Sequence, residues 1–166
     1  MTGSARHRVG QFWRHASARV TPPERATAEQ LLGPLAVLFL ELPVNDQRHG
    51  LDVLETVVRL EGQPNRLLQQ AALLHDVGKG GAHFSVVERS LTVALRAAWP
   101  AALTAVLRAR PALARRYAIY ADHARIGAQR LRAAGADDLA SIVAEHHALN
   151  PASEVTRQLQ RADGRN

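Results

Sequence analysis

Sequence runs that could form β-strands are nearly absent from this chain. Stretches rich in Val, Ile, Tyr and Thr are rare, and aromatic residues make up only 4% of the sequence. Alanine, leucine and arginine dominate instead, and these residues favour the α-helix. Hydrophobic residues make up 46% of the 166 residues, which is enough for one domain with a real core. The sequence therefore predicts an all-α fold in a single domain.

Proline and glycine mark where the helices should begin and end. Thr21-Pro22-Pro23-Glu24 is typical of a helix start, with a capping residue, prolines in the first turn and an acid near the positive helix end. The predicted helices span 21–40, 44–60, 65–76, 85–99, 101–109, 112–134, 137–149 and 153–162. We therefore expect a helical bundle of about seven to eight helices over residues 21–166, preceded by a basic, flexible arm at residues 1–20.

The charge and the absence of cysteine exclude several classes of protein. The formal net charge is +6, and all but one of the 21 Lys and Arg residues are arginine, the exception being Lys79. Because the arginines are scattered along the helices, we do not expect nucleic-acid binding to be the main role. The chain has no cysteine, so thiolate metal sites and cysteine nucleophiles are excluded. The most apolar run, residues 31–40, is too short to span a bilayer, and no signal peptide is recognised. We expect a cytoplasmic protein with no membrane partner.

Histidines and aspartates interrupt helix segments that are otherwise apolar. The positions concerned are His49, His75, Asp76, His123, His146, His147 and Asp163. Burying these imidazoles and carboxylates separately would be costly, whereas a shared metal site would satisfy them together. Without cysteine, such a site suits Mn, Fe, Zn, Co or Ni. A single histidine on a helix is more often a surface residue, and that interpretation is kept for His7, His15 and His83. Neighbours on a helix point about 100° apart, so the choice between His146 and His147 stays open.

The order of these residues resembles the HD-domain superfamily of metal-dependent phosphohydrolases. The resemblance rests on His49 in QRHGLDV, on LLHDVGK at residues 73–79, on DHARIG at residues 122–127, on His146-His147 in AEHHAL and on Asp163 in LQRAD. It runs from about residue 46 to residue 163 and is greatest to the HDIG-type branch, which includes the HD-GYP phosphodiesterases. An HD-domain-like helical bundle is the fold that it implies.

The resemblance also implies a role for each of these residues. It assigns one divalent ion to His49, His75, Asp76 and Asp163, with Asp76 bridging to a second ion held by His123 and His146, and with His147 as an additional candidate. Asp76 and Lys79 would be catalytic, and Lys79 would act as a compact cation facing a phosphate or the attacking water. Arginines next to the motifs are candidate substrate contacts: Arg48, Arg125 and Arg116.

Two departures from the family pattern limit these expectations. Ala-Leu-Asn-Pro follows His147, where HD-GYP proteins carry a glutamate and then a GYP segment, which argues against cyclic dinucleotide hydrolysis. Asn45 stands where members with three metals place a glutamate ligand, so we expect one or two ions.

The leading hypothesis is a metal-dependent phosphohydrolase, a phosphomonoesterase or phosphodiesterase. Its substrate would be a phosphate ester of a nucleotide or a similar small molecule. One alternative is a non-catalytic module that holds a metal or senses a ligand and acts through a protein partner. A second alternative is a nucleic-acid binder that uses the basic surface. The sequence predicts neither the substrate nor the oligomeric state.

Overall fold

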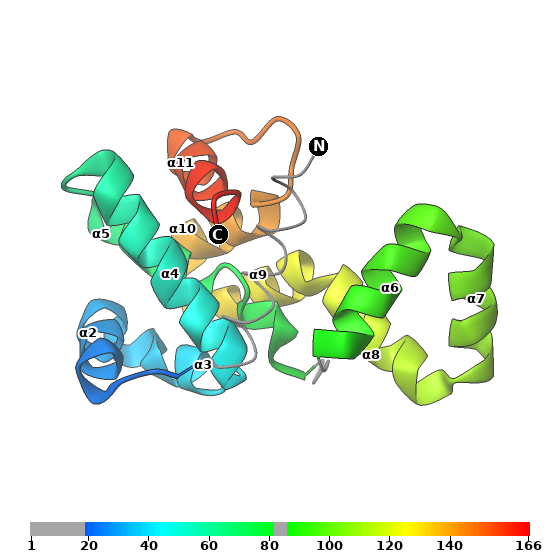
Figure 1. Ribbon diagram of the computed structural model, residues 1–166. Coiled ribbons are helices and arrows are strands. Elements are labelled where there is room, and N and C mark those ends of the chain that lie inside the picture. Colours follow the sequence, from blue (N-terminus) through cyan, green and yellow to red (C-terminus); the bar gives the residue numbers. More distant parts are fainter. Residues whose placement is uncertain (1–18, 82–85) are drawn as a thin grey trace, which may run out of the picture.

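The computed structural model describes residues 19–81 and 86–166, and every regular element in these ranges is helical (Figure 1). No strand occurs in these two ranges, which confirms the all-α prediction. The elements in chain order are α2 (Pro22–Leu32), η1 (Gly33–Leu35), α3 (Ala36–Leu40), α4 (Val44–Glu61), α5 (Arg66–Leu74), η2 (Val77–Gly81), α6 (Val86–Ala98), α7 (Pro100–Ala109), α8 (Pro111–Ala121), α9 (His123–Ala133), α10 (Asp137–Glu145) and α11 (Glu154–Asp163). Residues 1–18 of the predicted arm, which include His7 and His15, lie outside the described residues, and so does His83. The division into arm and domain therefore stays a prediction.

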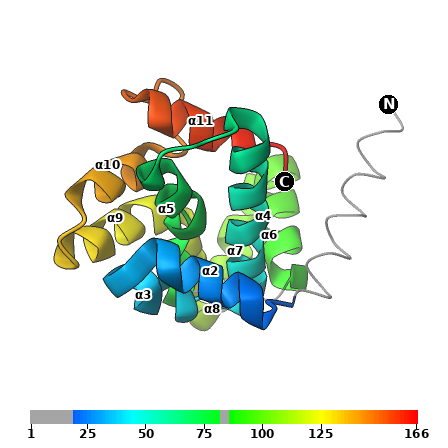
Figure 2. The same cartoon turned by 90° about the vertical axis from the view of Figure 1, so that its left-hand side faces the viewer.

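Helix α5 is the centre of the larger part of the fold. Asn65 caps its start by accepting a hydrogen bond from the backbone N–H of Leu68 at 2.8 Å. Leu68, Leu73 and Leu74 are at most 1% exposed. Helices α2, α4, α10 and α11 pack around α5, as Figure 2 shows. The C-terminal end of α5 therefore points into the interior of the molecule, and the His-Asp pair of the LLHDVGK motif follows there.

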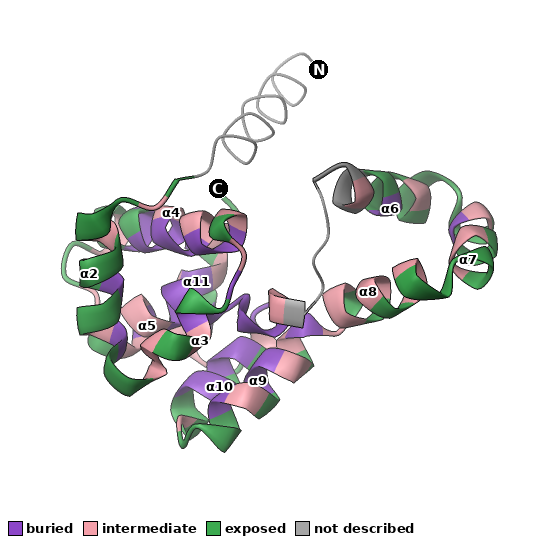
Figure 3. Ribbon diagram, turned by 90° about the horizontal axis from the view of Figure 1, so that it is seen from below, coloured by how far each residue is buried: buried purple, intermediate pink, exposed green. Residues whose placement is uncertain are grey.

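Helices α6, α7 and α8 form an extension to one side of this core, and we call them the outer helices (Figure 1). Helix α7 packs on both α6 and α8, and α8 contacts η2 and α9. A hydrogen-bonded ion pair of 2.8 Å between Arg116 on α8 and Glu88 on α6 ties the two flanking helices together. Figure 3 shows that buried residues concentrate in the core helices, while the outer helices are mostly exposed or half-buried.

The single helix predicted over residues 21–40 is wrong. The start is as predicted, because Thr21 and Glu24 form a reciprocal capping box in which Glu24 Oε2 accepts from the Thr21 N–H at 2.8 Å. The helix ends at Leu32, where Gly33 takes a φ of +56° that favours glycine. Pro34 follows, and a proline ring inside a straight helix would clash with the preceding turn. No helix in the described residues is long and apolar enough to cross a membrane.

Two further boundaries differ from the prediction, and both affect histidines. The predicted helix over 112–134 breaks at Asp122, whose φ of −110° and ψ of 14° are not helical. His123 therefore begins α9 instead of lying in the middle of a long helix. The helix predicted to reach residue 149 ends at Glu145, so His146 is the C-cap of α10. Both corrections place a histidine at a helix end.

Candidate metal centre

The structure brings all of the predicted metal ligands together in one region. They come from the middle of α4, from the C-terminal ends of α5, α10 and α11, and from the N-terminal end of α9: His49, His75, Asp76, His123, His146, His147 and Asp163. His75, Asp76 and His146 are 1%, 3% and 4% exposed, whereas His147 is exposed. The region is therefore buried on the side of α5 and open on the side of His147.

Four of these residues form what we call the first group: His49, His75, Asp76 and Asp163. The Nε2 atom of His49 lies 3.3 Å from Nε2 of His75 and 3.0 Å from Oδ1 of Asp163. Oδ2 of Asp76 lies 3.6 Å from His75 Nε2 and 3.9 Å from His49 Nε2. Two nitrogens and two carboxylates thus face one small space.

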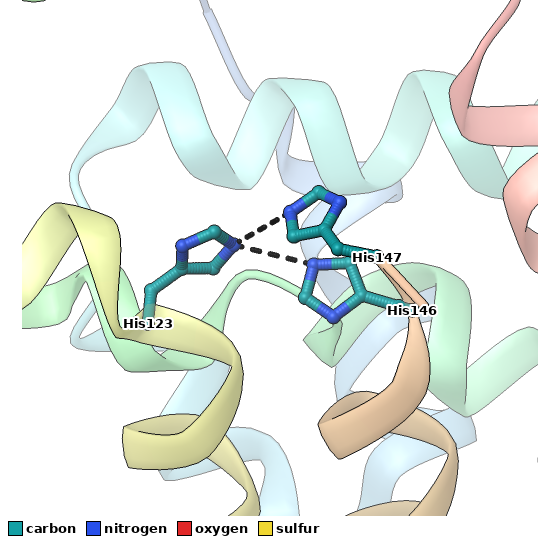
Figure 4. Close-up of side chains that lie close together, drawn as sticks. All are labelled: His123, His146 and His147. Carbon is teal, nitrogen blue, oxygen red and sulfur yellow. Dashed lines mark hydrogen bonds between the residues drawn. The ribbon is translucent and has the colours of Figure 1, made fainter. Parts of the chain in front are cut away.

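The other three residues, His123, His146 and His147, form the second group (Figure 4). The Nε2 atom of His123 lies 3.2 Å from Nε2 of His146 and 3.1 Å from Nε2 of His147. The two neighbours on the chain both reach the site because α10 has ended before them. The 100° separation expected on a helix does not apply at this point, and both imidazoles remain candidate ligands.

Asp76 lies between the two groups and faces each with a different oxygen. Oδ2 faces the first group, and Oδ1 lies 3.3 Å from His123 Nε2 and 4.0 Å from His146 Nε2 in the second group. A carboxylate in this position can bind one ion through each oxygen. This geometry matches the bridging role that the family resemblance implies for Asp76.

Backbone carbonyls orient three of the histidines. The Nδ1 atoms of His75, His123 and His146 lie 3.0, 2.7 and 2.6 Å from the carbonyl oxygens three residues earlier in the chain, those of Ala72, Tyr120 and Val143. An Nδ1–H that donates to a carbonyl leaves Nε2 with its lone pair directed into the site. The sequence did not reveal these carbonyls, because any residue type at a helix end can supply one.

The donor set fits divalent metal ions. With their protons on Nδ1, His123 and His146 direct two Nε2 lone pairs at each other across 3.2 Å. Two such lone pairs repel unless a proton or a cation lies between them. Two ligands about 2.0–2.1 Å from one ion lie about 3.0–3.4 Å apart at ordinary coordination angles. The Nε2 spacings of 3.1–3.3 Å in both groups agree with that range.

Electrostatics keep most of the donors in the forms that bind metals. His49 is the exception: burial alone would lower its pKa, but the hydrogen bond to Asp163 and the charge of Asp76 raise it. Burial lowers the pKa of His75, and burial together with the charge of His75 lowers the pKa of His146 to about 3. Burial alone would raise the pKa of Asp76, but Lys79 and the surrounding histidines hold this pKa well below its usual range. Neutral imidazoles and an ionised carboxylate are the ligand forms that a divalent ion requires.

Lys79 contacts the centre directly. Its Nζ lies 2.5 Å from Oδ2 of Asp76, and its side chain is 12% exposed. The ammonium also lies 5.6 Å from the centroid of the Tyr120 ring, within the range of a cation–π contact. The only lysine of the chain therefore places its charge at the carboxylate that the two groups share.

Gly78 and Gly127 allow η2 and α9 to approach closely. A Cβ atom on Gly78 would stand 1.9 Å from the carbonyl oxygen of His123 and 2.6 Å from the backbone nitrogen of Gly127. The φ of Gly78 is not among the positive values in the described residues, so no left-handed backbone conformation requires a glycine here. The close approach is what requires a glycine here, and it sets the distance between Asp76 and His123.

The predicted arginine contacts lie in ion pairs. Arg48 pairs with Glu24 at 2.5 Å and with Asp52 at 2.9 Å, and so joins α4 to α2. Arg125 is exposed and pairs with Asp122, and Arg116 pairs with Glu88 on α6. Their assignment as substrate contacts stays a prediction.

The comparison with protein families gives one match. The family model described as Cas3, HD domain matches residues 35–166, a range that contains all of the candidate ligands. No curated protein and no solved structure matches the chain. The match supports the resemblance to the HD-domain superfamily, while the HDIG branch and the relation to HD-GYP proteins stay predictions.

Proposed function

The chain belongs to the Cas3 HD-domain family, and from this premise and the geometry of the centre we propose that it is a metal-dependent nuclease. This family is a nuclease-type member of the HD-domain phosphohydrolases. The proposed reaction is the hydrolysis of phosphodiester bonds in nucleic acid. The proposal narrows the wider expectation of a phosphohydrolase, and it changes the expected substrate from a small nucleotide ester to a strand.

The position of Asp76 between the two groups is the observation that carries the proposal. Its two oxygens face separate sets of nitrogen donors, at 3.6 Å from His75 and at 3.3 Å from His123. Two ion sites joined by one carboxylate suit the in-line displacement of phosphodiesters, in which the attacking and leaving oxygens both need stabilisation. We therefore propose a centre for two ions, with Mn, Fe, Co, Ni or Zn as candidates.

The residues of the centre would have separate roles in the proposed reaction. Divalent ions bound there would act as Lewis acids on the phosphate oxygens and lower the pKa of the attacking water. The carbonyls behind His75, His123 and His146 hold these imidazoles in place. Lys79 would hold a phosphate oxygen next to Asp76, because a compact ammonium fits where the fork of an arginine does not.

Two other functions remain as outcomes of the test. Hydrolysis of free nucleotides would use the same centre and differ only in the substrate. A non-catalytic module is less consistent with the site, because the described residues keep a complete set of ligands on both sides of Asp76.

The experiment supplies metal-free protein with Mn²⁺, Co²⁺, Ni²⁺, Zn²⁺ or Mg²⁺ in turn. The substrates are circular single-stranded DNA, single-stranded RNA, bis(p-nitrophenyl) phosphate, p-nitrophenyl phosphate and a set of free nucleotides. We expect cleavage of at least one nucleic acid and of the model diester. Turnover of free nucleotides alone would move the assignment to a nucleotidase, and no turnover with any metal would overturn the proposal.

A matched pair of variants identifies the centre as the source of activity. Asp76→Asn removes the shared carboxylate charge without changing its shape and should abolish cleavage. Glu29→Gln removes one carboxylate charge from the exposed face of α2 and should leave cleavage unchanged. Equal activity of the two variants would mean that a contaminating nuclease had been measured.

A further inference from the structure

We propose that Gln160 on α11 is a positioning residue for the candidate metal centre, and that its side-chain amide holds the backbone around His147 so that this imidazole can bind the second ion. Nε2 of Gln160 donates hydrogen bonds to the carbonyl oxygen of His146 at 3.2 Å and to that of Ala148 at 2.8 Å. The inference rests on the two-ion centre of the proposed function and adds to it the residue that fixes one of the ligands.

His147 lacks the support that the other imidazoles of the second group have (Figure 4). The Nδ1 atoms of His123 and His146 lie 2.7 and 2.6 Å from backbone carbonyl oxygens, and both residues are buried. His147 is exposed, and its Nδ1 makes no hydrogen bond to a backbone carbonyl among the described residues. The direction of this imidazole therefore depends on where the backbone of His147 is held.

The backbone of His147 lies beyond the end of α10. The helix ends at Glu145, and the N–H of Ala148 donates to the carbonyl oxygen of Glu145 at 2.8 Å in the turn that follows. Carbonyl oxygens at and after a helix end have no partner within the helix and need another donor. Gln160 supplies a donor to two of them, and these two carbonyls stand on either side of His147 in the chain.

Helix α11 is a firm base for this amide. It packs on both α4 and α5, and Leu159 and Ala162, which are close to Gln160 in the chain, are at most 1% exposed. Asp163 follows Gln160 on the same helix after about one turn. Gln160 therefore joins the segment that carries His147, in the second group, to the helix that carries Asp163, in the first group.

A held backbone makes an exposed imidazole a better ligand. A side chain that is already in position loses less conformational freedom when it binds, so more of the interaction energy remains as affinity. Nε2 of His147 lies 3.1 Å from Nε2 of His123, a spacing that suits two ligands on one ion. Without the two hydrogen bonds from Gln160, His147 should turn toward solvent and leave the second ion with His123 and His146.

Gln158 provides a matched control on the same helix. It is half-buried like Gln160, and its Nε2 donates a hydrogen bond to Oε2 of Glu61 at 2.8 Å. This bond joins α11 to α4, whereas the bonds of Gln160 join α11 to the backbone around His147. Loss of either amide removes a bond between α11 and its neighbours, but only the loss of Gln160 should reach the metal centre.

The test titrates Mn²⁺ into the chelator-treated full chain by calorimetry and follows the binding event that His146→Ala weakens. Gln160→Met keeps the length of the side chain and removes both donors, and it should weaken this event about fivefold or more. Gln160→Glu keeps the shape and also lacks the donors, and it should weaken the event although its negative charge attracts a cation. Gln158→Met should leave the event unchanged. Circular dichroism shows that each variant is folded, and Gln160→Glu decides the outcome if Gln160→Met does not fold.

A double-mutant cycle shows whether Gln160 acts through His147. His147→Ala should weaken the same binding event at least as much as Gln160→Met does. Adding Gln160→Met to His147→Ala should cause no further loss, because the imidazole that the amide positions is already absent. An equal loss with and without His147 would mean that Gln160 affects the centre by another route.

Cobalt provides a second readout, which a loss of stability alone does not change. The visible absorption of bound Co²⁺ depends on the number and type of its ligands. Gln160→Met should therefore change the spectrum of the Co²⁺-loaded chain in the same direction as His147→Ala, while Gln158→Met should keep the spectrum of the unaltered chain.

The inference is overturned by any of three results: no binding of Mn²⁺ by the unaltered chain, unchanged affinity in the Gln160 variants, or an equal loss in Gln158→Met. Turnover of bis(p-nitrophenyl) phosphate tests the proposed function separately. Weakened Mn²⁺ binding in Gln160→Met without any turnover by the unaltered chain would support the role of Gln160 and remove the nuclease proposal. Turnover by the unaltered chain together with unchanged Mn²⁺ binding in Gln160→Met would do the reverse.

Discussion

Gly78 lies against His123 so closely that a methyl group on Gly78 would stand 1.9 Å from the carbonyl oxygen of His123. This contact holds the segment that follows Asp76 against the first turn of α9. Asp76 comes directly before the first of these segments and His123 begins the second, so the contact fixes the distance between these two candidate ligands.

Gly78→Ala should therefore be strongly destabilising. The backbone atoms that the added Cβ meets cannot move aside as a flexible side chain could, and we expect a loss of about 2–4 kcal/mol in the free energy of unfolding. Urea denaturation followed by circular dichroism measures this loss. Gly127→Ala should cost less, because the nearest atoms, at 3.1 Å, include side-chain methyls of Val77 and Val143. Equal losses in the two variants would contradict this explanation.

His146 and His147 should contribute unequally to metal binding. His146 is 4% exposed and its Nδ1 is held by the carbonyl of Val143 at 2.6 Å, whereas His147 is exposed. We expect His146→Ala to weaken binding of the second ion more than tenfold and more than His147→Ala does, because the held imidazole loses less freedom on binding. Isothermal titration with Mn²⁺ measures both. A larger loss in His147→Ala would reverse the assignment.

Lys79 should act on the reaction and not on metal retention. Lys79→Met keeps the apolar stem and removes the charge next to Asp76. We expect turnover of the model diester to fall about tenfold or more while the ion content stays the same, and we expect Lys79→Arg to restore little, because the guanidinium has a different shape. Elemental analysis and initial rates on the same samples provide the two readouts. An unchanged rate in Lys79→Met would leave Lys79 without a catalytic role.

The Glu24–Arg48 ion pair predicts a pH effect that is independent of the metal centre. The hydrogen bond from Arg48, followed by that from the backbone of Thr21, lowers the pKa of Glu24 to about 2. A lowered carboxyl pKa contributes stability above the unfolded-state pKa, near 4.5, and this contribution is lost as the pH falls toward 2. Glu24→Gln should have a lower free energy of unfolding than the unaltered chain at pH 6. The difference between the two free energies should become smaller as the pH falls from 4.5 to 2.

Urea denaturation at several pH values measures this difference directly. Glu29→Gln is the matched control, because Glu29 is an exposed carboxylate on the same helix. A constant difference between the Glu24 variant and the unaltered chain across this pH range would show that the ion pair does not stabilise the fold.

The sequence allowed the fold class and the candidate ligands to be predicted, for different reasons. Composition and the breaks at proline and glycine indicate helices without reference to tertiary structure. The break at Gly33 and Pro34 has a local signal in these two residues, but the apolar run over residues 31–40 continues across it and favours an unbroken helix. The break at Asp122 has no glycine or proline, and its effect, which places His123 at a helix start, depends on how α8 and α9 pack.

The arrangement of the candidate ligands was harder to predict from the sequence than their identity. The order of histidines and aspartates identified the candidate ligands. That the two oxygens of Asp76 face different groups depends on the way five helices pack together. The carbonyls that orient the imidazoles have no sequence signal, because any residue type at a helix end can supply one.

The most direct test of the role of Asp76 is a measurement of how many divalent ions the chain binds with and without this carboxylate. Isothermal titration of Mn²⁺ into chelator-treated protein should give two ions per chain for the unaltered sequence, and Asp76→Asn should weaken both binding events because each ion loses one carboxylate oxygen. Two ions bound by Asp76→Asn with unchanged affinity, or no ion bound by the unaltered chain, would contradict the assignment of Asp76 as the ligand that joins the two groups.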